Sequence, residues 1–170
     1  MITGIDHIGL ATEDPAGVAA FLTALGMGMD DQGIAAEYGV ACEFWSYPAA
    51  GGQPAIELVT PVREDSALSD HFSRRSPSLY HVAFEVDDLD SELTRLRGRG
   101  LVPVDAAPCA GARPGMRVAF MYVPKPAALL IELVQYGVVD ADSADPVSAD
   151  PVSADAVSVA DEPPAVTAEG

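Results

Sequence analysis

Two histidines and two glutamates in this sequence recur at almost the same interval. His7 is followed by His81, and Glu57 by Glu132, so each half of the chain carries one imidazole and one carboxylate. Imidazole nitrogens and carboxylate oxygens suit a borderline divalent ion such as Co, Ni, Mn, Fe or Zn, and four of them leave coordination positions open for substrate oxygens. The sequence therefore predicts one divalent metal ion held by these four side chains.

The residues around these side chains repeat as well. The segment DHIGLATED at 6–14 corresponds to YHVAFEVDD at 80–88, and IELV at 56–59 recurs letter for letter at 131–134. A single histidine on a strand is more often a half-buried structural residue, and a single glutamate usually faces solvent. Four such residues in duplicated register favour a binding site, because repeats place equivalent side chains in equivalent positions.

The first half of the chain indicates the order β-α-β-β-β. Residues 3–11 alternate as a strand, and Glu13-Asp14-Pro15 is typical of a helix start. Apolar residues at helical spacing follow as far as Gly26, which is typical of a helix end. Runs rich in aromatic and β-branched residues at 38–47 and 54–60 predict strands.

The second half follows the same order. Its apolar pattern predicts a strand at 79–86, a helix at about 88–98, and strands near 101–104, 117–123 and 128–135.

The predicted fold class is α+β, with two tandem βαβββ modules at about 2–61 and 78–136. One such unit leaves a face of its sheet bare, so the two modules should curve around a shared cleft and form one domain over 1–137. The connector at 62–77 carries a short amphipathic helix, and its histidine, His71, is expected at the surface.

Composition changes sharply after residue 137. Residues 138–170 have no basic or aromatic side chain and repeat an acidic pentapeptide, which predicts a disordered acidic tail. The net charge of −17 argues against nucleic acid or an anionic membrane surface as partner. No membrane segment or secretion signal is recognisable, and two distant cysteines make no disulfide framework. We therefore expect a cytoplasmic protein.

Over about residues 2–136 the sequence resembles the vicinal oxygen chelate superfamily, which includes glyoxalase I, bleomycin-resistance proteins, extradiol dioxygenases and methylmalonyl-CoA epimerase. The shared motifs are DHIG at 6–9, HVAFEVDD at 81–88 and the two IEL strands. The stretch TPVREDSAL at 60–68 is most similar to the methylmalonyl-CoA epimerase family. The resemblance implies a glyoxalase-like fold, a homodimer, and the same four metal ligands, with Gln often replacing the residue at Glu57.

The resemblance also implies a reaction, namely proton abstraction and return next to a metal-bound carbonyl. An epimerase needs an electrophile for the enolate oxygen, which the metal supplies, and a base on each side of the substrate carbon. Glu132 resembles one of these bases. The stretch YGVACE at 38–43 resembles the segment that carries the second base, which makes Glu43 the candidate. A gapless match instead places Cys42 there, and Glu43 would then point away unless a bulge shifts the register.

Two loops depart from the epimerase pattern, GARPG at 111–115 and VPKPAA at 123–128. The expected substrate is therefore an acyl-CoA or another small α-acidic carbonyl compound. Arg113, Arg117 and Lys125 could hold a phosphate or carboxylate of that substrate, or they could be scattered surface cations.

Other functions in the superfamily stay open. A lactoylglutathione lyase-like enzyme acting on a thiol adduct would use the same four ligands. A drug-sequestering resistance protein would usually lack these ligands. An extradiol dioxygenase uses two histidines and one carboxylate, and a fourth ligand would obstruct its open face. The leading prediction is a metal-dependent isomerase.

Overall fold

The structure is a computed structural model that describes residues 1–48, 51–74 and 78–137. The chain divides into the units Met1–Val139 and Asp140–Gly170. The disordered tail expected at 138–170 lies outside the described residues. Among those residues, no helix combines the length and apolar character needed to cross a membrane.

The first module has the predicted order of elements. Strand β1 (Ile2–Ala11) and helix α1 (Pro15–Ala24) are followed by strands β2 (Gly28–Ala35), β3 (Val40–Ser46) and β4 (Ala55–Pro61). Helix α1 begins where the sequence indicates, because the side chain of Asp14 accepts a hydrogen bond from the backbone N–H of Gly17. Strand β2 is mostly polar and gave no strand signal of its own. Its strand structure depends on the ladder with β3.

The second module repeats this order after the connector helix α2 (Ser69–Arg74). The side chain of Asp88 accepts a hydrogen bond from the backbone N–H of Ser91 and so begins helix α3. A short additional strand, β7, pairs with β8. The elements of this module are β5 (Ser78–Val86), α3 (Leu89–Arg97), β6 (Val102–Pro103), β7 (Cys109–Ala110), β8 (Met116–Val123) and β9 (Leu129–Tyr136).

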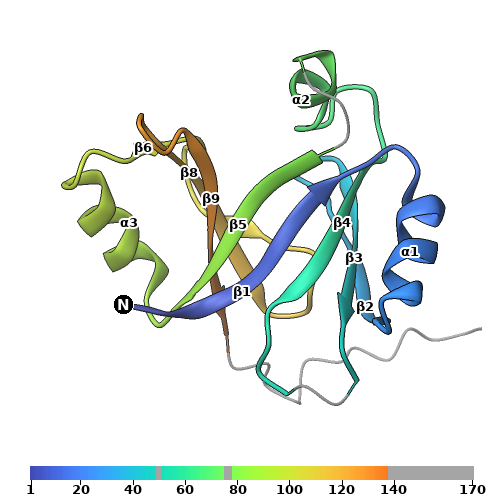
Figure 1. The fold of residues 1–170 in the computed structure, drawn as a ribbon. Coiled ribbons are helices and arrows are strands. Elements are labelled where there is room, and N and C mark those ends of the chain that lie inside the picture. The colour runs from blue at the N-terminus through green and yellow to red at the C-terminus, as the bar shows by residue number, and fades with distance from the viewer. Residues whose placement is uncertain (49–50, 75–77, 138–170) are drawn as a thin grey trace, which may run out of the picture. The chain divides into compact units, whose positions relative to one another are not determined.

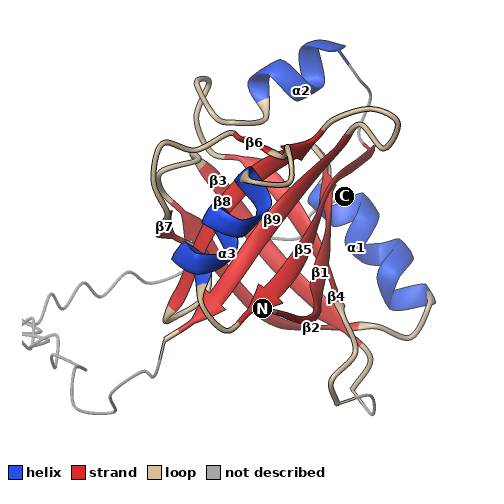
Figure 2. Cartoon of the chain, turned by 90° about the vertical axis from the view of Figure 1, so that its left-hand side faces the viewer, coloured by secondary structure: helices blue, strands red, loops and turns tan. Residues whose placement is uncertain are grey.

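All the strands belong to one sheet with the order β2-β3-β4-β1-β5-β9-β8-β6, and β7 lies beside β8. The modules meet where their first strands, β1 and β5, pair antiparallel. The strands curve around a common interior, with α1 and α3 on opposite outer sides (Figures 1 and 2). This arrangement confirms the predicted α+β fold of two tandem modules.

The duplication extends to strand register. In the first module Glu57 pairs with Gly9, two residues beyond His7. In the second module Glu132 pairs with Ala83, two residues beyond His81. Because β1 and β5 also pair with each other, the two histidine strands are neighbours at the centre of the sheet.

Apolar side chains pack on both faces of the sheet. On the outer face, Leu22 of α1 packs with Trp45 and Leu58, while α3 covers the second module with Leu89 and its neighbours. On the inner face, Phe44 belongs to a separate cluster. Burial on both faces fixes the register, since a slip of one residue would exchange the inward and outward side chains of a strand.

Candidate metal centre

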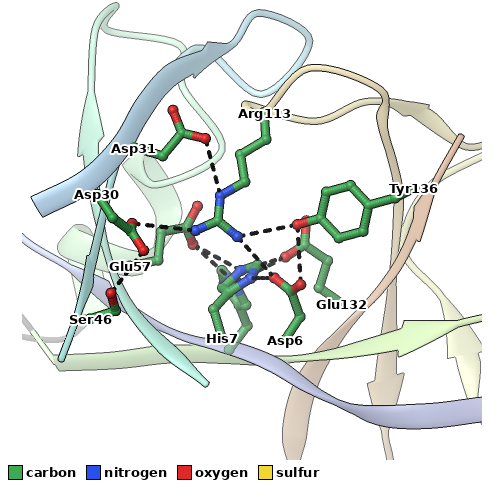
Figure 3. Close-up of polar contacts among 10 residues, drawn as sticks. Asp6, His7, Asp30, Asp31, Ser46, Glu57, Arg113, Glu132 and Tyr136 are labelled. Atoms are coloured by element: carbon green, nitrogen blue, oxygen red, sulfur yellow. Dashed lines mark hydrogen bonds and ion pairs between the residues drawn. The ribbon is translucent and has the colours of Figure 1, made fainter. Parts of the chain in front are cut away.

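Four buried side chains meet where the two modules join. The Nε2 atoms of His7 and His81 lie 3.0 Å apart. Oε2 of Glu132 lies 3.0 Å from Nε2 of His7 and 3.2 Å from Nε2 of His81. Oε2 of Glu57 lies 3.2 Å from both nitrogens. The structure thus brings together the whole set of expected ligands, with Glu57 and Glu132 on either side of His7 (Figure 3).

The arrangement fits a divalent cation. Neighbouring ligand atoms around an ion with bonds of about 2.0–2.2 Å are about 3 Å apart, which agrees with the measured separations. Each of the four residues is 5% exposed or less. Buried charges in proteins are normally paired or coordinate a metal, and Oε2 of Glu57 has no hydrogen-bond partner in the described residues. Potential ligand atoms of His7, His81 and Glu132 also lie within 4.8 Å of one another.

Gly9 gives His81 the room to reach this cluster. The two residues are partners across the β1–β5 ladder. A Cβ atom at residue 9 would overlap the imidazole ring of His81, so any other residue would displace the ring. The glycine of the DHIG motif therefore has a steric role in the site.

On the side away from the cluster, the Nδ1 atom of His7 contacts a series of hydrogen-bonded polar residues that the sequence prediction did not include. Its Nδ1 lies 2.5 Å from Oδ1 of Asp6. The hydroxyl of Tyr136 donates to Oδ2 of Asp6 at 3.1 Å, and Nη1 of Arg113 donates to the Tyr136 hydroxyl at 3.2 Å (Figure 3). Asp6 could have been suspected because it precedes His7. Tyr136 lies at the far end of the domain sequence and gave no signal.

Two of the three cations considered for substrate binding, Arg113 and Arg117, contact protein carboxylates, while Lys125 is exposed. The guanidinium of Arg113 lies 3.8 Å from Asp30 and 3.5 Å from Asp31, and its Cζ lies 3.7 Å from the ring centroid of Phe44. Arg117 forms an exposed ion pair with a carboxylate of α3 at 3.3 Å. Arg113 therefore supports His7 indirectly, through its contacts with Tyr136 and Asp6.

The histidines and glutamates of the cluster shift one another's pKa values. Burial alone would lower the pKa of His7, but the neighbouring carboxylates of Asp6, Glu132 and Glu57 raise it well above the ordinary value. The pKa of His81 is raised by its two glutamate partners in spite of burial. Burial would raise the pKa of each glutamate, yet the close contact with the two imidazoles lowers it in both.

These shifts predict how the stability of the cation-free protein depends on pH. Raised histidine pKa values contribute stability that is complete below the ordinary value of 6.5 and is lost as pH rises through the raised values. Lowered glutamate pKa values contribute stability that is complete above 4.5 and is lost as pH falls through the lowered values. The thermal unfolding midpoint of chelator-treated protein should therefore be highest between these two limits. An increase in the midpoint from pH 6.5 to alkaline pH would contradict the prediction.

The structure separates Glu43 from the cluster. Its carboxylate accepts a hydrogen bond from the indole N–H of Trp45 at 3.1 Å, and Trp45 packs with Leu22 of α1 on the outer face of the sheet. Strand β3 pairs without a bulge from Cys42 to Trp45 along β4, so alternation directs Cys42 inward and Glu43 outward. The geometry does not support Glu43 as the second base.

Cys42 takes the inward position. Its side chain is buried beside Glu57, and both burial and that carboxylate raise the pKa of the thiol. A thiol whose thiolate is disfavoured is a poor acid and a poor metal ligand at neutral pH. Its place in the structure is therefore that of a packing residue in the wall of the cleft.

A cavity adjoins the cluster on its inner side. It has a volume of about 20 Å³, which leaves room for about one water molecule. Its wall combines Glu57, His81 and Glu132 with apolar and aromatic side chains, among them Tyr80 and Phe120. An open groove of about 720 Å³ shares Tyr80 and Ala67 with this cavity and leads to the outside. The groove, and not the cavity, has the volume to hold part of a small molecule.

Comparison with known proteins agrees with this architecture. A family model described as the Glyoxalase/Bleomycin resistance protein/Dioxygenase superfamily matches residues 6–120. Among curated protein sequences there is no match. A methylmalonyl-CoA epimerase from Mycobacterium tuberculosis is 28% identical with a TM-score of 0.71, and the match covers 80% of this chain and 89% of that chain.

Two further solved structures contain ligands. A methylmalonyl-CoA epimerase in complex with methylmalonyl-CoA and NH4+ is 28% identical with a TM-score of 0.72, and the match covers 82% of this chain and 98% of that one. A variant methylmalonyl-CoA epimerase of Streptomyces coelicolor in complex with 2-nitronate-propionyl-CoA gives the same four values, 28%, 0.72, 82% and 98%. The similarity covers the two modules and confirms the glyoxalase-like fold.

Proposed function

The chain belongs to the glyoxalase/bleomycin resistance protein/dioxygenase superfamily, also called vicinal oxygen chelate, and we propose that it is a metal-dependent epimerase or isomerase. The reaction would move a proton on the carbon next to a carbonyl group. The observation that carries this proposal is the buried meeting of two imidazoles and two carboxylates beside a cavity. The likeness to methylmalonyl-CoA epimerases supports the choice of reaction.

In this proposal His7, Glu57, His81 and Glu132 hold one divalent ion. An ion bound there would supply a Lewis acid for the carbonyl oxygen and would stabilise the negative charge that develops on it. The apolar wall of the cavity strengthens such electrostatic effects because it excludes water.

Glu132 is the proposed base. Its carboxylate accepts the proton of the substrate carbon, the electron pair of the broken C–H bond moves to the carbonyl oxygen, and an enolate results. Glu57 comes from the equivalent strand of the other module and is the remaining carboxylate at the cavity. Because the two imidazoles lower its pKa, Glu57 is ionised and does not itself supply a proton. The proton for the opposite face would come from a water molecule in the cavity. The hydroxide left behind would then take the proton from Glu132, which restores both groups.

The proposed substrate is an acyl-CoA or another α-acidic carbonyl compound. The cavity has room for about one water molecule, so most of the substrate would lie in the groove beyond Tyr80, with its carbonyl group directed toward the cluster. The loops at 111–115 and 123–128 differ from the epimerase pattern, which leaves room for a substrate other than methylmalonyl-CoA. We further propose that the enzyme is a homodimer, as the family resemblance implies, and that it is cytoplasmic.

A lyase acting on a thiol adduct is the second candidate. The observation that favours it is the carboxylate at Glu57, because glyoxalase I commonly has Glu where the epimerases often have Gln. Both reactions begin with abstraction of a proton next to a carbonyl, so they differ in product rather than in the first step. A protein that only sequesters a drug would not need the four converging side chains.

Proton NMR in deuterium oxide tests the proposal. Metal-loaded protein is incubated with methylmalonyl-CoA and with a panel of α-acidic ketones and glutathione adducts. The expected result is loss of the α-proton signal of at least one compound, with inversion at that carbon. Conversion of a glutathione adduct to a thioester would support the lyase instead. Bound metal without proton exchange in any compound would contradict both enzymes and favour sequestration.

A further inference from the structure

The two imidazoles of the centre are supported in different ways, although the modules are copies of each other. Asp6 precedes His7, whereas Tyr80 stands at the equivalent position before His81. Nδ1 of His7 faces the Asp6 carboxylate at 2.5 Å. Nδ1 of His81 is buried and has no hydrogen-bond partner in the described part of the chain. The duplicated centre therefore has one hydrogen-bonded imidazole and one that is not.

His81 is held by packing. Its ring meets the rings of Tyr80 and Phe120 edge to face, with centroids 5.2 Å and 5.1 Å away. Gly9 closes the other side of the same ring. Such contacts fix where the ring lies, but they do not select which of its nitrogens carries a proton.

Asp6 is itself fixed by two further residues. Its side chain is 10% exposed, and its Oδ2 accepts a hydrogen bond from the hydroxyl of Tyr136. The guanidinium of Arg113 donates to that hydroxyl and lies 3.7 Å from Oδ1 of Asp6. Arg113 also stacks on Phe44, whose ring meets the His7 ring edge to face. Arg113 thus contacts both Asp6 and Phe44, the two residues that support the His7 ring.

The loop that carries Arg113 is fitted closely to the first module. A Cβ atom at Gly33 of β2 would overlap the carbonyl group of Ala112, so the glycine allows the loop to approach the strand. Asp31 on the same strand lies 3.5 Å from Nε of Arg113. The second module therefore supplies, through this loop and through Tyr136, the groups that hold the Asp6–His7 pair of the first module.

We propose that Asp6, held by Tyr136 and Arg113, is a positioning residue that makes His7 the anchored imidazole of the centre. A carboxylate beside Nδ1 keeps the proton on that nitrogen and directs the lone pair of Nε2 toward the cluster. It also makes Nε2 a more basic ligand for a metal ion. His81 has no such partner and contributes through packing. The inference rests on the proposed function, because it assumes that Nε2 of His7 binds a cation.

Zinc titration of metal-free protein measures the effect on the cation site. The dissociation constant is determined by competition with a chromogenic chelator for the wild type and for Asp6→Asn. The expected result is affinity weakened by about 10- to 100-fold, the usual consequence of losing such a partner. Asp30→Asn is the matched control, because it removes an equal charge near Arg113 without touching Asp6 or His7, and it should bind zinc nearly as the wild type does. Equal affinity in Asp6→Asn and Asp30→Asn would overturn the proposal.

Proton NMR of the metal-free protein provides a readout that fold stability alone would not change. The Nδ1 proton of His7 should give a far-downfield, slowly exchanging resonance because it is shared with a carboxylate, and Asp6→Asn should move this resonance upfield. A resonance that stays in place would overturn the proposal. If Asp6→Asn does not fold, Tyr136→Phe removes the hydroxyl that donates a hydrogen bond to Asp6 and should weaken zinc binding more than Asp30→Asn does. A wild type that takes up no zinc would defeat the proposed function, while the resonance would still decide whether Asp6 holds His7.

Discussion

Replacement of Glu132 by glutamine is expected to lower the rate of α-proton exchange by about 10²- to 10⁴-fold, the usual contribution of a general base. Glutamine keeps the length of the side chain and an oxygen that can face the cluster, but it cannot accept a proton. Glu132 lies within 3.2 Å of both imidazoles. The substitution removes the base, and because the side chain keeps its size, most of the cavity wall stays in place. The measurement is the initial rate of α-proton loss in deuterium oxide at saturating substrate and metal.

Two controls sharpen this experiment. Glu13→Gln changes an exposed carboxylate outside the cavity and should leave the rate unchanged. Glu43→Gln should also leave it nearly unchanged, because Glu43 lies on the outer face and is bonded to Trp45. A large loss in Glu43→Gln together with a small loss in Glu132→Gln would show that the assignment of the base is wrong.

Replacement of His7 by alanine should abolish metal binding. His7 is central to the cluster, since its Nε2 lies 3.0 Å from His81 and Glu132 and 3.2 Å from Glu57. Its removal leaves two buried carboxylates with one imidazole, and Asp6 loses one of its hydrogen-bond partners. Elemental analysis of the dialysed wild type should give about one divalent ion per chain, as expected for one such site, and His7→Ala should give essentially none.

His71→Ala is the matched control for this loss. His71 belongs to α2, outside the cluster, and its Nε2 lies 3.3 Å from the hydroxyl of Ser78. The variant should retain the metal content of the wild type. If His7→Ala kept its metal while His71→Ala lost it, the cation would have to lie elsewhere.

The four cluster residues were predictable because the duplication places each histidine and each glutamate at a matching position in the two modules. Alone, His7 or Glu57 would have been read as an ordinary strand residue. The repeat aligned each with a partner, and strand pairing then placed Glu57 and Glu132 at equivalent positions relative to the histidines. The βαβββ order followed from the same repeat, together with capping and turn residues such as Asp14 and Gly26.

The features that escaped prediction depend on contacts between segments distant in sequence. Strand β2 is an edge strand whose polar sequence is stabilised by pairing with β3, and no local pattern reveals that pairing. Tyr136 reaches Asp6 only because β9 and β1 both lie beside β5. For Arg113 the sequence left open a substrate contact or a surface cation, yet its loop folds onto β2 and buries most of the guanidinium. The side that Glu43 faces depended on whether β3 contains a bulge, which the sequence left undecided.

The central claim is that four side chains bind one cation, and X-ray absorption spectroscopy at the metal edge of cobalt- or zinc-loaded protein tests it most directly. The expected first shell contains two imidazole nitrogens and carboxylate oxygens at about 2.0–2.2 Å. A sulfur scatterer at about 2.3 Å, which would implicate Cys42, or a shell with fewer than two imidazoles, would contradict the claim.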